Sequence, residues 1–410
     1  MHQPTPAPPA PLSRRRFAQL FGLGVATAAL GPAAARAAAA VAAGQAAAGS
    51  PAGVAGGAPA GAAAGAVKPP LRLVRAALDP EVVRLSSNEN PYGPARSAFD
   101  AMQEAFGIAW RYPDEQGDAL ADDLARHNAV AASSILLGAG SSEILKLCAA
   151  AFAGPGRPAV VAEPTFEALG HHVERTGGDV RRVPLTADFR HDTAKLLAAA
   201  PDGGLIYVCN PNNPTATITP KAELRALLAA VPARTTVLVD EAYHHYVESA
   251  DYESVIPLVA QHPNLVVART FSKIYGMAGL RCGYAVAQPE TIARLRAHQQ
   301  FDSVNVMALV AARAALADAE HTASGRRLNA EVKSMVVSEL DRLGYRTLPS
   351  EANFLMIDLR RPVGPVREAL HARRVDVGRV FPPLPNHLRV TVGTRPQMQA
   401  FLAAFRQVTA

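Results

Sequence analysis

Short apolar runs alternate with amphipathic segments along the middle of the chain, from about residue 119 to residue 298. The runs have the length of strands and cover residues 134–138, 158–164, 205–210, 235–242 and 265–271. Residues 143–153 and 221–231, which lie between them, repeat apolar side chains at helical spacing. Strands that alternate with helices build parallel sheets with both faces covered, so the pattern predicts an α/β fold with a mostly parallel sheet in a large domain.

The pattern changes near Met307. Residues 326–344 predict one long helix, and residues 353–359 and 387–393 predict strands, which together indicate a smaller α+β domain. We therefore predict an N-terminal arm and part of the small domain at 68–110, a large domain at 111–306 and a small C-terminal domain at 307–410.

The first 67 residues have a different composition. Residues 13–20, SRRRFAQL, place paired arginines before a phenylalanine, and a mildly apolar stretch with small-residue cleavage candidates near Ala35 or Ala37 follows. This order resembles a twin-arginine export signal, which predicts a signal peptide at 1–37, recognition by the twin-arginine export machinery and a periplasmic or otherwise exported protein. A basic disordered tail is the alternative. Residues 38–67, rich in Ala, Gly and Pro, predict a flexible linker.

Net charge adds little to this picture. The chain carries a formal charge of +6, but residues 1–67 hold four arginines and no acidic residue, so the signal supplies most of it. We therefore expect no nucleic-acid partner.

Cysteine and histidine positions predict packing rather than metal binding. Cys148, Cys209 and Cys282 fall in or beside apolar runs without paired spacing, which is typical of small buried hydrophobes. The pairs His171–His172 and His244–His245 are expected to be packing or surface residues, and we predict no metal site.

Polar groups follow four of the predicted strands. The turn Gly140–Ser142 opens a helix and offers backbone N–H groups that suit a phosphate. The groups at or beyond the ends of the runs 205–210, 235–242 and 265–271 are Asn213, then Asp240 and Tyr243, then Thr270, Lys273 and Arg281. Ligands of open α/β sheets bind beyond the carboxyl ends of the strands, so we expect these groups to lie close together.

Pyridoxal 5'-phosphate is a ligand that needs this collection of groups. Its aldehyde forms a Schiff base with a lysine, and its ring nitrogen pairs with a carboxylate that favours the protonated ring. Its phenolic oxygen takes hydrogen bonds from a phenol or an amide, and its phosphate needs N–H groups, hydroxyls and a planar cation. The sequence therefore predicts a pyridoxal-phosphate site around Lys273.

Over roughly residues 80–405 the chain resembles the fold-type I pyridoxal-phosphate-dependent aminotransferases, and most closely the histidinol-phosphate aminotransferase family. The matching stretches are NENPYGP, RYPDEQGDAL, EPTFEAL, NPNNPT, VDEAYHHY, TFSKIYGMAGLRCGY, SEANFLMID and LRVTVGT. The resemblance implies a homodimeric enzyme that moves an amino group between an L-amino acid, or an amino phosphate, and a 2-oxo acid. Its partners would be small amino and keto acids.

The resemblance also implies roles for matching residues around the cofactor ring. Lys273 would carry the cofactor and shuttle a proton at the substrate's α-carbon. Asp240 would pair with the ring nitrogen, and Tyr243 and Asn213 with the phenolic oxygen. Phe166 would stack on the ring, which suits its flat apolar side chain.

The same carry-over assigns the phosphate and the substrate. The residues implied to hold the phosphate are Gly140, Ser141, Ser142, Thr270, Ser272 and Arg281, with Tyr112 reaching the phosphate of the neighbouring subunit. Arg389 matches an arginine that clamps the substrate carboxylate, Asn353 belongs to the same substrate set, and Arg379 aligns near the substrate's far end.

Two positions depart from the family pattern. Ala216 stands where the family usually has glycine, a mild change if the backbone there avoids positive φ. Family members that act on histidinol phosphate carry a tyrosine in an arm before NENP, and residues 67–85 contain none. We therefore expect ordinary L-amino acids, with glutamate as a donor, to be better substrates than histidinol phosphate.

Other interpretations remain open. A decarboxylase or a carbon–sulfur lyase on the same scaffold, and a true histidinol-phosphate transaminase, fit the same motifs. A non-catalytic regulator is disfavoured by the export signal and by the lack of a recognisable helix-turn-helix pattern. A nucleotide-dependent Rossmann enzyme is disfavoured because GAGSSE, residues 138–143, lacks the third glycine of its fingerprint.

Overall fold

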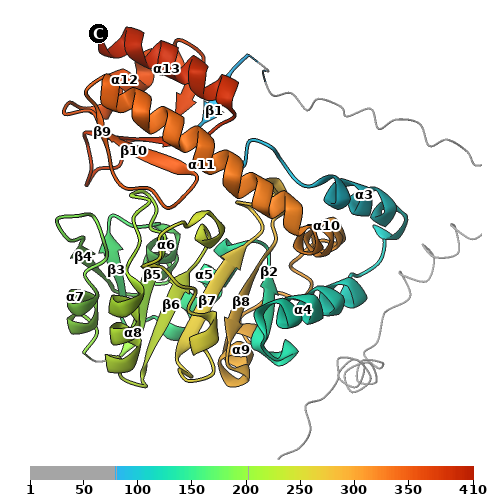
Figure 1. Ribbon diagram of the computed structural model, residues 1–410. Coiled ribbons are helices and arrows are strands. Elements are labelled where there is room, and N and C mark those ends of the chain that lie inside the picture. Colours follow the sequence, from blue (N-terminus) through green and yellow to red (C-terminus); the bar gives the residue numbers. More distant parts are fainter. Residues whose placement is uncertain (1–78, 80, 202) are drawn as a thin grey trace, which may run out of the picture. The chain divides into compact units, whose positions relative to one another are not determined.

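The computed structural model describes residues 79, 81–201 and 203–410. The predicted signal peptide at 1–37, the linker at 38–67 and the first part of the predicted arm lie outside the described residues. The described chain contains two sheets with layers of helices and a separate pair of short strands (Figure 1).

The large sheet has seven strands in the order β2-β8-β7-β6-β5-β3-β4. Their bounds are β2 (Ile135–Gly138), β3 (Ala159–Glu163), β4 (Val180–Pro184), β5 (Gly204–Cys209), β6 (Thr235–Asp240), β7 (Leu265–Thr270) and β8 (Gly283–Ala287). Only β8 among these strands runs antiparallel to its neighbours β2 and β7. The prediction of a mostly parallel sheet is therefore confirmed.

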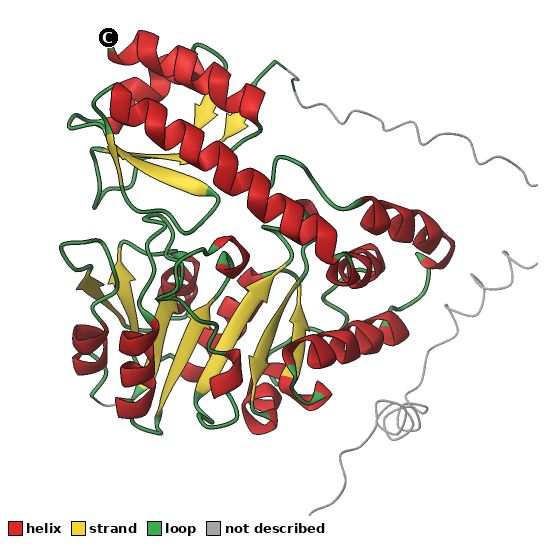
Figure 2. Ribbon diagram, viewed as in Figure 1, coloured by secondary structure: helices red, strands yellow, loops and turns green. Residues whose placement is uncertain are grey.

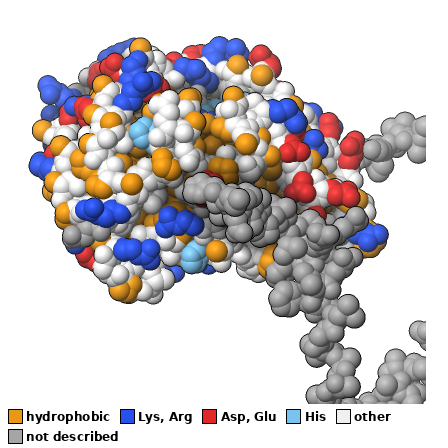
Figure 3. Space-filling model, turned by 90° about the horizontal axis from the view of Figure 1, so that it is seen from below, with side chains coloured by type: hydrophobic (Ala, Val, Ile, Leu, Met, Phe, Trp, Pro, Cys, Tyr) orange, Lys and Arg blue, Asp and Glu red, His pale blue; other side chains and the backbone are white. Residues whose placement is uncertain are grey.

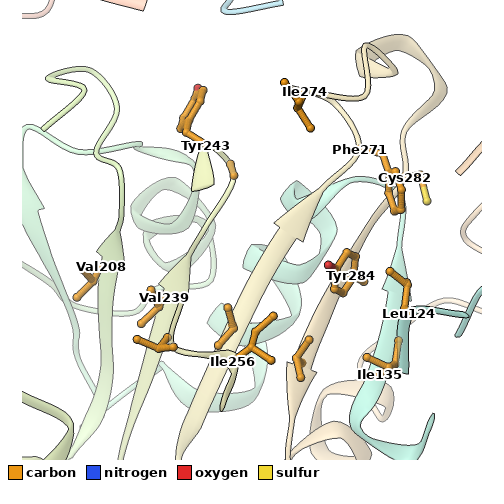
Figure 4. Packing of buried hydrophobic residues seen from close by; sticks show 14 of the residues in the cluster. Leu124, Ile135, Val208, Val239, Tyr243, Ile256, Phe271, Ile274, Cys282 and Tyr284 are labelled. Carbon is orange, nitrogen blue, oxygen red and sulfur yellow. The ribbon is translucent and has the colours of Figure 1, made fainter. Parts of the chain in front are cut away.

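Apolar side chains alternate between the two faces of this sheet. Val208 and Val239 belong to one core, whereas Tyr207 and Leu238 belong to the core on the opposite face. Figure 4 shows part of the first core, with Val208 and Val239 along neighbouring strands. Because both faces are apolar, the sheet is covered on both, as predicted.

Two sets of helices cover these faces. The first core includes residues of α3 (Arg96–Ala105), α4 (Asp114–Asn128), α7 (Thr193–Ala198), α8 (Lys221–Ala230) and α10 (Val306–Ala317). The second includes residues of α5 (Ser141–Phe152), α6 (Ala168–Arg175) and α9 (Pro289–Arg296). Short 3-10 helices lie in the connections: η1 (Phe106–Ile108), η2 (Ala132–Ser134), η3 (His244–Tyr246), η4 (Ile256–Leu258) and η5 (Ala278–Leu280).

A smaller core is built mainly from the C-terminal residues (Figure 1). Its elements are α11 (Ala319–Arg342), β9 (Arg346–Thr347), β10 (Phe354–Asp358), α12 (Val363–His371), β11 (Val375–Val377), β12 (His387–Thr391) and α13 (Arg395–Thr409). Strand β10 pairs antiparallel with β12 and β9, and β1 (Val83–Leu85) pairs parallel with β11. The N-terminal segment of the described chain therefore joins the C-terminal core through β1.

Local sequence explains where the best-defined helices begin and end (Figure 2). Helix α13 begins with a capping box, in which Thr394 and Gln397 each accept from the other's backbone N–H. Helix α4 has Asp114 and Glu115 in its first turn, Arg126 and His127 in its last turn, and Ala129 as its C-cap in the left-handed conformation. Acidic residues at the start of a helix and basic ones at its end complement the helix dipole, so both ends are stabilised locally.

The predictions for cysteine are confirmed, because Cys148, Cys209 and Cys282 are free and buried. Within the described ranges, no helix is both long enough and apolar enough to cross a bilayer. Figure 3 shows one face of the molecule, where apolar side chains lie between charged ones. Such mixing is ordinary for a folded protein, whose accessible surface is largely contributed by apolar atoms.

Candidate active site

A cavity of about 270 Å³ lies beyond the carboxyl ends of β5, β6 and β7. It collects most of the residues that the sequence singled out. Those that line it are Ser141, Ser142, Phe166, Asn213, Asp240, Tyr243, Thr270, Ser272, Lys273, Arg281, Arg379 and Arg389. The prediction that the polar groups at these strand ends lie close together is therefore confirmed.

Three further predicted residues do not line the cavity. Gly140 precedes Ser141 with φ +78, and a Cβ at this position would come within 2.2 Å of the Arg281 guanidinium, so a side chain here would strain the backbone and push the guanidinium aside. Asn353 is buried behind the cavity and donates from Nδ2 to the carbonyl oxygen of Asn88 at 3.1 Å. Tyr112 is 82% exposed and is not among the lining residues.

Lys273 lies in the loop that follows β7. Its Nζ donates to the carbonyl oxygen of Asn88 at 3.2 Å and lies 5.3 Å from the centroid of the Tyr243 ring. Burial, with a further contribution from the positive charge of Arg389, lowers the pKa of Lys273 to about 8. The amine is therefore neutral in a substantial fraction of molecules near physiological pH.

Asp240 ends β6 and is almost completely buried. Its Oδ2 accepts from the Tyr207 hydroxyl at 3.0 Å, and its Oδ1 accepts from the backbone N–H of Ala242 at 3.1 Å. Burial raises the pKa of Asp240 to about 6, while these two donors act in the opposite direction. The carboxylate is thus fixed in orientation and ready to pair with a cationic ring nitrogen.

Tyr243 stands beyond the end of β6 (Figure 4). Its hydroxyl accepts from Asn88 Nδ2 at 3.1 Å, and its ring packs edge-on against Phe354 with centroids 5.2 Å apart. Asn213, in the turn after β5, accepts at Oδ1 from Arg389 Nη1 at 2.7 Å. Both predicted partners of a phenolic oxygen are therefore held by neighbours.

Hydroxyl groups and a guanidinium surround the N-terminus of α5. The Thr270 hydroxyl donates to Ser272 Oγ at 2.9 Å. Arg281 reaches from the connection between β7 and β8, with Nη1 donating to the Ala278 carbonyl at 2.9 Å and Nη2 to Ser142 Oγ at 3.4 Å. With the free N–H groups at the helix start, this cluster is suited to a phosphate dianion.

A buried ion pair braces this arrangement. Glu241 follows Asp240, Arg269 precedes Thr270, and their side chains are 1% and 8% exposed. Arg269 donates to Glu241 Oε2 from Nη2 at 2.8 Å and from Nε at 3.0 Å. Since breaking a buried pair leaves an uncompensated charge, this contact holds the ends of β6 and β7 in one relative position.

Arg389, on β12, brings a guanidinium to the same cavity. Its Nη2 donates to the carbonyl oxygen of Ser86 at 2.7 Å. Its Nε is buried and finds no hydrogen-bond partner among the described residues, and the same is true of Asn353 Oδ1. Among the described residues the Arg389 guanidinium donates to an amide oxygen and a backbone carbonyl and pairs with no carboxylate, so its charge is available to an anion in the cavity.

Arg379 lies in the loop that follows β11 and pairs with Glu167, which follows Phe166. Both residues line the cavity, and each side chain is 46% exposed. This ion pair at the cavity therefore connects the loop after β11 with the start of α6.

Sequence reasoning missed two residues of this site. Asn88 contacts both Lys273 and Tyr243 and belongs to the quoted stretch NENPYGP, yet no role was predicted for it. Tyr207 lies inside β5, where its hydroxyl was the one signal of a polar contact in an otherwise apolar strand.

One conditional expectation fails. Ala216 was expected to be a mild replacement for glycine if its φ were negative, but its φ is +64. The residue is fully buried and its N–H donates to the carbonyl oxygen of Asn212 at 2.8 Å, so the turn holds alanine in the left-handed conformation.

The donor set fits pyridoxal phosphate. The cavity offers an amine of lowered pKa, an oriented carboxylate, a phenol, an amide and an anion cradle next to Gly140, where a side chain would displace the Arg281 guanidinium. No cluster of three or more His, Cys, Asp or Glu suited to a metal ion occurs in the described part of the chain.

Comparisons with known proteins agree with this chemistry. Residues 80–405 match the family model of class I and II aminotransferases. A histidinol-phosphate aminotransferase of Moorella thermoacetica is 42% identical over 334 residues, covering 80% of this chain and 86% of the relative. One from Symbiobacterium thermophilum is 42% identical over 327 residues, with 80% and 90% covered. The crystal structure of histidinol-phosphate aminotransferase from Sinorhizobium meliloti in complex with pyridoxal-5'-phosphate is similar with a TM-score of 0.75, at 29% identity, over 80% of this chain and 90% of that one.

Proposed function

Because the chain belongs to the class I and II aminotransferase family, we propose that it exchanges amino groups between L-amino acids and 2-oxo acids and binds their α-carboxylate at Arg389. The chain is a pyridoxal-phosphate-dependent aminotransferase of fold type I. One observation carries the substrate proposal: Arg389 lines the cavity that holds Lys273, and its guanidinium has no carboxylate partner among the described residues. A carboxylate is the group that satisfies a planar guanidinium best.

Lys273 is the base in this proposal. When bound, pyridoxal phosphate supplies an electron-withdrawing ring that stabilises negative charge at the substrate's α-carbon. Nζ of Lys273 would take the proton from that carbon and pass it to the cofactor, and would move a proton the opposite way when a 2-oxo acid accepts the amino group. The lowered pKa of about 8 supports this role, because a general base works best when its pKa lies near the operating pH.

The remaining side chains would hold the cofactor and orient the substrate. Asp240 would pair with the ring nitrogen, Tyr243 and Asn213 would bind the phenolic oxygen, and Phe166 would pack on the ring face. The cluster of Ser141, Ser142, Thr270, Ser272 and Arg281, with the Gly140 turn, would hold the phosphate. Asn353 does not line the cavity and donates from Nδ2 to the Asn88 carbonyl, so it would act by holding Asn88 rather than by binding the substrate carboxylate itself.

The test is a single-substrate half-reaction. Purified protein loaded with cofactor is mixed with each common L-amino acid in turn, and the 2-oxo acid and the pyridoxamine phosphate formed are quantified together. We expect one or more amino acids, glutamate among them, to give equal amounts of both products. Release of carbon dioxide or sulfide without pyridoxamine phosphate would instead identify a decarboxylase or a carbon–sulfur lyase.

Histidinol phosphate is the second candidate substrate. It is favoured by the names of the relatives and by Arg379, a second cation at the cavity mouth. It carries a phosphorylated hydroxymethyl group where an amino acid carries its α-carboxylate, so its anion would also reach Arg389. Arg389→Ala should therefore lower kcat/KM for both substrates, for glutamate by a factor that corresponds to about 2–5 kcal/mol of transition-state stabilisation. If wild-type kcat/KM is far higher for histidinol phosphate than for every amino acid, the second candidate is the substrate.

We also propose that the enzyme is exported through the twin-arginine route. The support is the order of paired arginines, apolar stretch and small residues within 1–37. The double variant Arg14→Lys with Arg15→Lys should remain active but stay in the cytoplasmic fraction. Unchanged export of that variant would show that another signal operates.

A homodimer is the last part of the proposal. Phe106, Trp110 and Tyr112 are 69%, 73% and 82% exposed within a short stretch of chain. Large aromatic side chains this exposed are typical of interaction surfaces. In the proposed dimer, Tyr112 reaches the phosphate cluster of the partner subunit.

A further inference from the structure

We propose that Glu167 is a built-in competitor for Arg379, which a distal anionic group of the substrate must displace. Glu167 thereby sets how strongly the site favours substrates with two anionic ends over substrates with one. This inference rests on the proposed function, because it takes the α-carboxylate to be bound at Arg389.

The ion pair lies where a substrate's far end would arrive. Glu167 follows Phe166 at the start of α6, and Arg379 stands two residues before Phe381. The guanidinium carbons of Arg379 and Arg389 lie 4.3 Å and 5.1 Å from the centroid of the Phe381 ring. The Phe381 ring therefore lies against both guanidinium groups. Arg389 would bind the α-carboxylate of a dianionic substrate, and Arg379 its second anionic group.

The two members of the pair are held unequally. Arg379 stacks on Phe381 and donates from Nη1 to the Val380 carbonyl at 3.2 Å, besides pairing with Glu167. For the Glu167 carboxylate, the contact recorded within the described chain is the one with Arg379. An arriving anion would therefore displace the carboxylate and leave the guanidinium in place.

The displaced carboxylate has a favourable position available. Glu167 is the N-cap residue of α6, and its side chain makes no capping hydrogen bond there. The first N–H groups of a helix and the positive end of its dipole attract a carboxylate. The cost of opening the pair is correspondingly small.

Charge balance then separates two classes of substrate. A substrate with one carboxylate neutralises Arg389 and leaves the Glu167–Arg379 pair closed. A substrate with a second anionic group gains Arg379 only by opening that pair. A transamination cycle uses one site for two different substrates, and this arrangement admits a neutral side chain and an anionic one without leaving Arg379 unpaired.

The test uses unreactive acids and the cofactor-loaded enzyme. Dissociation constants of butyrate, glutarate and 3-phosphonopropionate are measured by calorimetry for the wild type and for Glu167→Gln. The matched control is Glu163→Gln, because Glu163 is a similarly exposed carboxylate on an arginine, Arg182, and lies outside the cavity lining.

Half-exposed ion pairs are weak, so we expect Glu167→Gln to tighten a dianion about threefold to fivefold and to leave butyrate unchanged. The dianion that shows the larger gain identifies the distal group as carboxylate or phosphoryl. An unchanged or weakened affinity for both dianions overturns the proposal, as does an equal gain for butyrate or in Glu163→Gln. None of these acids can react, so the binding result stands or falls separately from the transamination assay.

Discussion

Burial beside a cation gives the Lys273 amine a reactivity that a surface lysine lacks. Burial and Arg389 lower the pKa of Lys273 to about 8, so the neutral amine becomes available as pH rises through that value. The rate at which cofactor-free protein reacts with pyridoxal phosphate should therefore rise with pH, with a midpoint near 8. Rapid-mixing absorbance measures this rate, and borohydride reduction with peptide mapping locates the adduct. Lys273→Ala should fold and give no adduct; a midpoint above about 10 would contradict the assignment.

The hydrogen bond from Tyr207 makes a second residue-scale prediction. Because the pKa of Asp240 is raised to about 6 in the folded state, its contribution to stability is present below about pH 4 and is lost as pH rises through about 6. Tyr207→Phe removes a donor that favours the carboxylate, so the pKa rises further and the loss should extend to higher pH. The melting temperature of the cofactor-free protein between about pH 5 and pH 8 measures this extension.

Two variants control the Tyr207 experiment. Tyr252→Phe removes a buried hydroxyl that has no partner in the described chain, so its pH profile should follow the wild type. Asp240→Asn removes the Asp240 contribution to the profile, so adding Tyr207→Phe to it should cause no further extension to higher pH; the variant should bind cofactor and lose most of the catalytic rate. A Tyr207→Phe profile parallel to that of the wild type would show that the hydrogen bond does not tune Asp240.

The residues that sequence could place are those that directly follow an apolar run. Asp240, Thr270 and Lys273 do so, and the parallel strands bring them to one edge of the sheet. The role of Asn88 could not be predicted, because its hydrogen-bond partners lie 155 to 303 residues away in the sequence and no local pattern indicates such contacts. The charge state of Lys273 escaped too, because it depends on burial in three dimensions.

At the scale of elements, the turn after β5 carries a testable strain. Ala216 at φ +64 costs about 1–2 kcal/mol relative to a right-handed conformation. Ala216→Gly relieves that strain but loses a buried methyl group, about 0.8 kcal/mol, and gives the unfolded chain more freedom, about 0.5–1 kcal/mol. The free energy of unfolding should therefore change by less than about 1 kcal/mol.

The control for Ala216 lies in a helix. Ala312 is equally buried within α10, where glycine loses helix propensity as well as the methyl contact. Ala312→Gly should destabilise by about 2 kcal/mol. Denaturant unfolding of both variants compares them, and an equal loss in the two would show that the Ala216 turn is not strained.

Elements with a continuous apolar run were predictable, and those defined by their pairing were not. Strands β5, β6 and β7 match the runs from which they were predicted. Strand β8 was missed because its five residues follow the Arg281 loop directly, and its antiparallel direction leaves no trace in composition. Strand β1 has three residues, and only its partner β11, far along the chain, makes it a strand.

At the scale of the whole molecule, the proposed dimer predicts an effect at a distance. Tyr112 is 82% exposed in one chain, so its substitution should not disturb that chain's own fold. If Tyr112 completes the partner's phosphate cluster, Tyr112→Ala should weaken cofactor binding several-fold, measured by equilibrium dialysis. Phe301→Ala, at a residue 78% exposed, is the matched control and should bind cofactor normally. A monomeric mass in light scattering, together with unchanged cofactor binding in Tyr112→Ala, would show that no partner subunit contributes to the site.

The pairing of β1 with β11 also sets when the site can form during synthesis. The backbone N–H of Asn88 donates to Thr391 Oγ1 at 2.9 Å across a separation of 303 residues, and β1 pairs with residues 375–377. A nascent chain has all strands of the large sheet once residue 287 has been made, yet it still lacks the segment that fixes Asn88 beside Lys273. Pairings between such distant segments form late and slowly. The complete site therefore forms only after residues 375–391 have been made. An exported enzyme that travels folded would bind its cofactor, and become ready for export, once β11 had paired with β1.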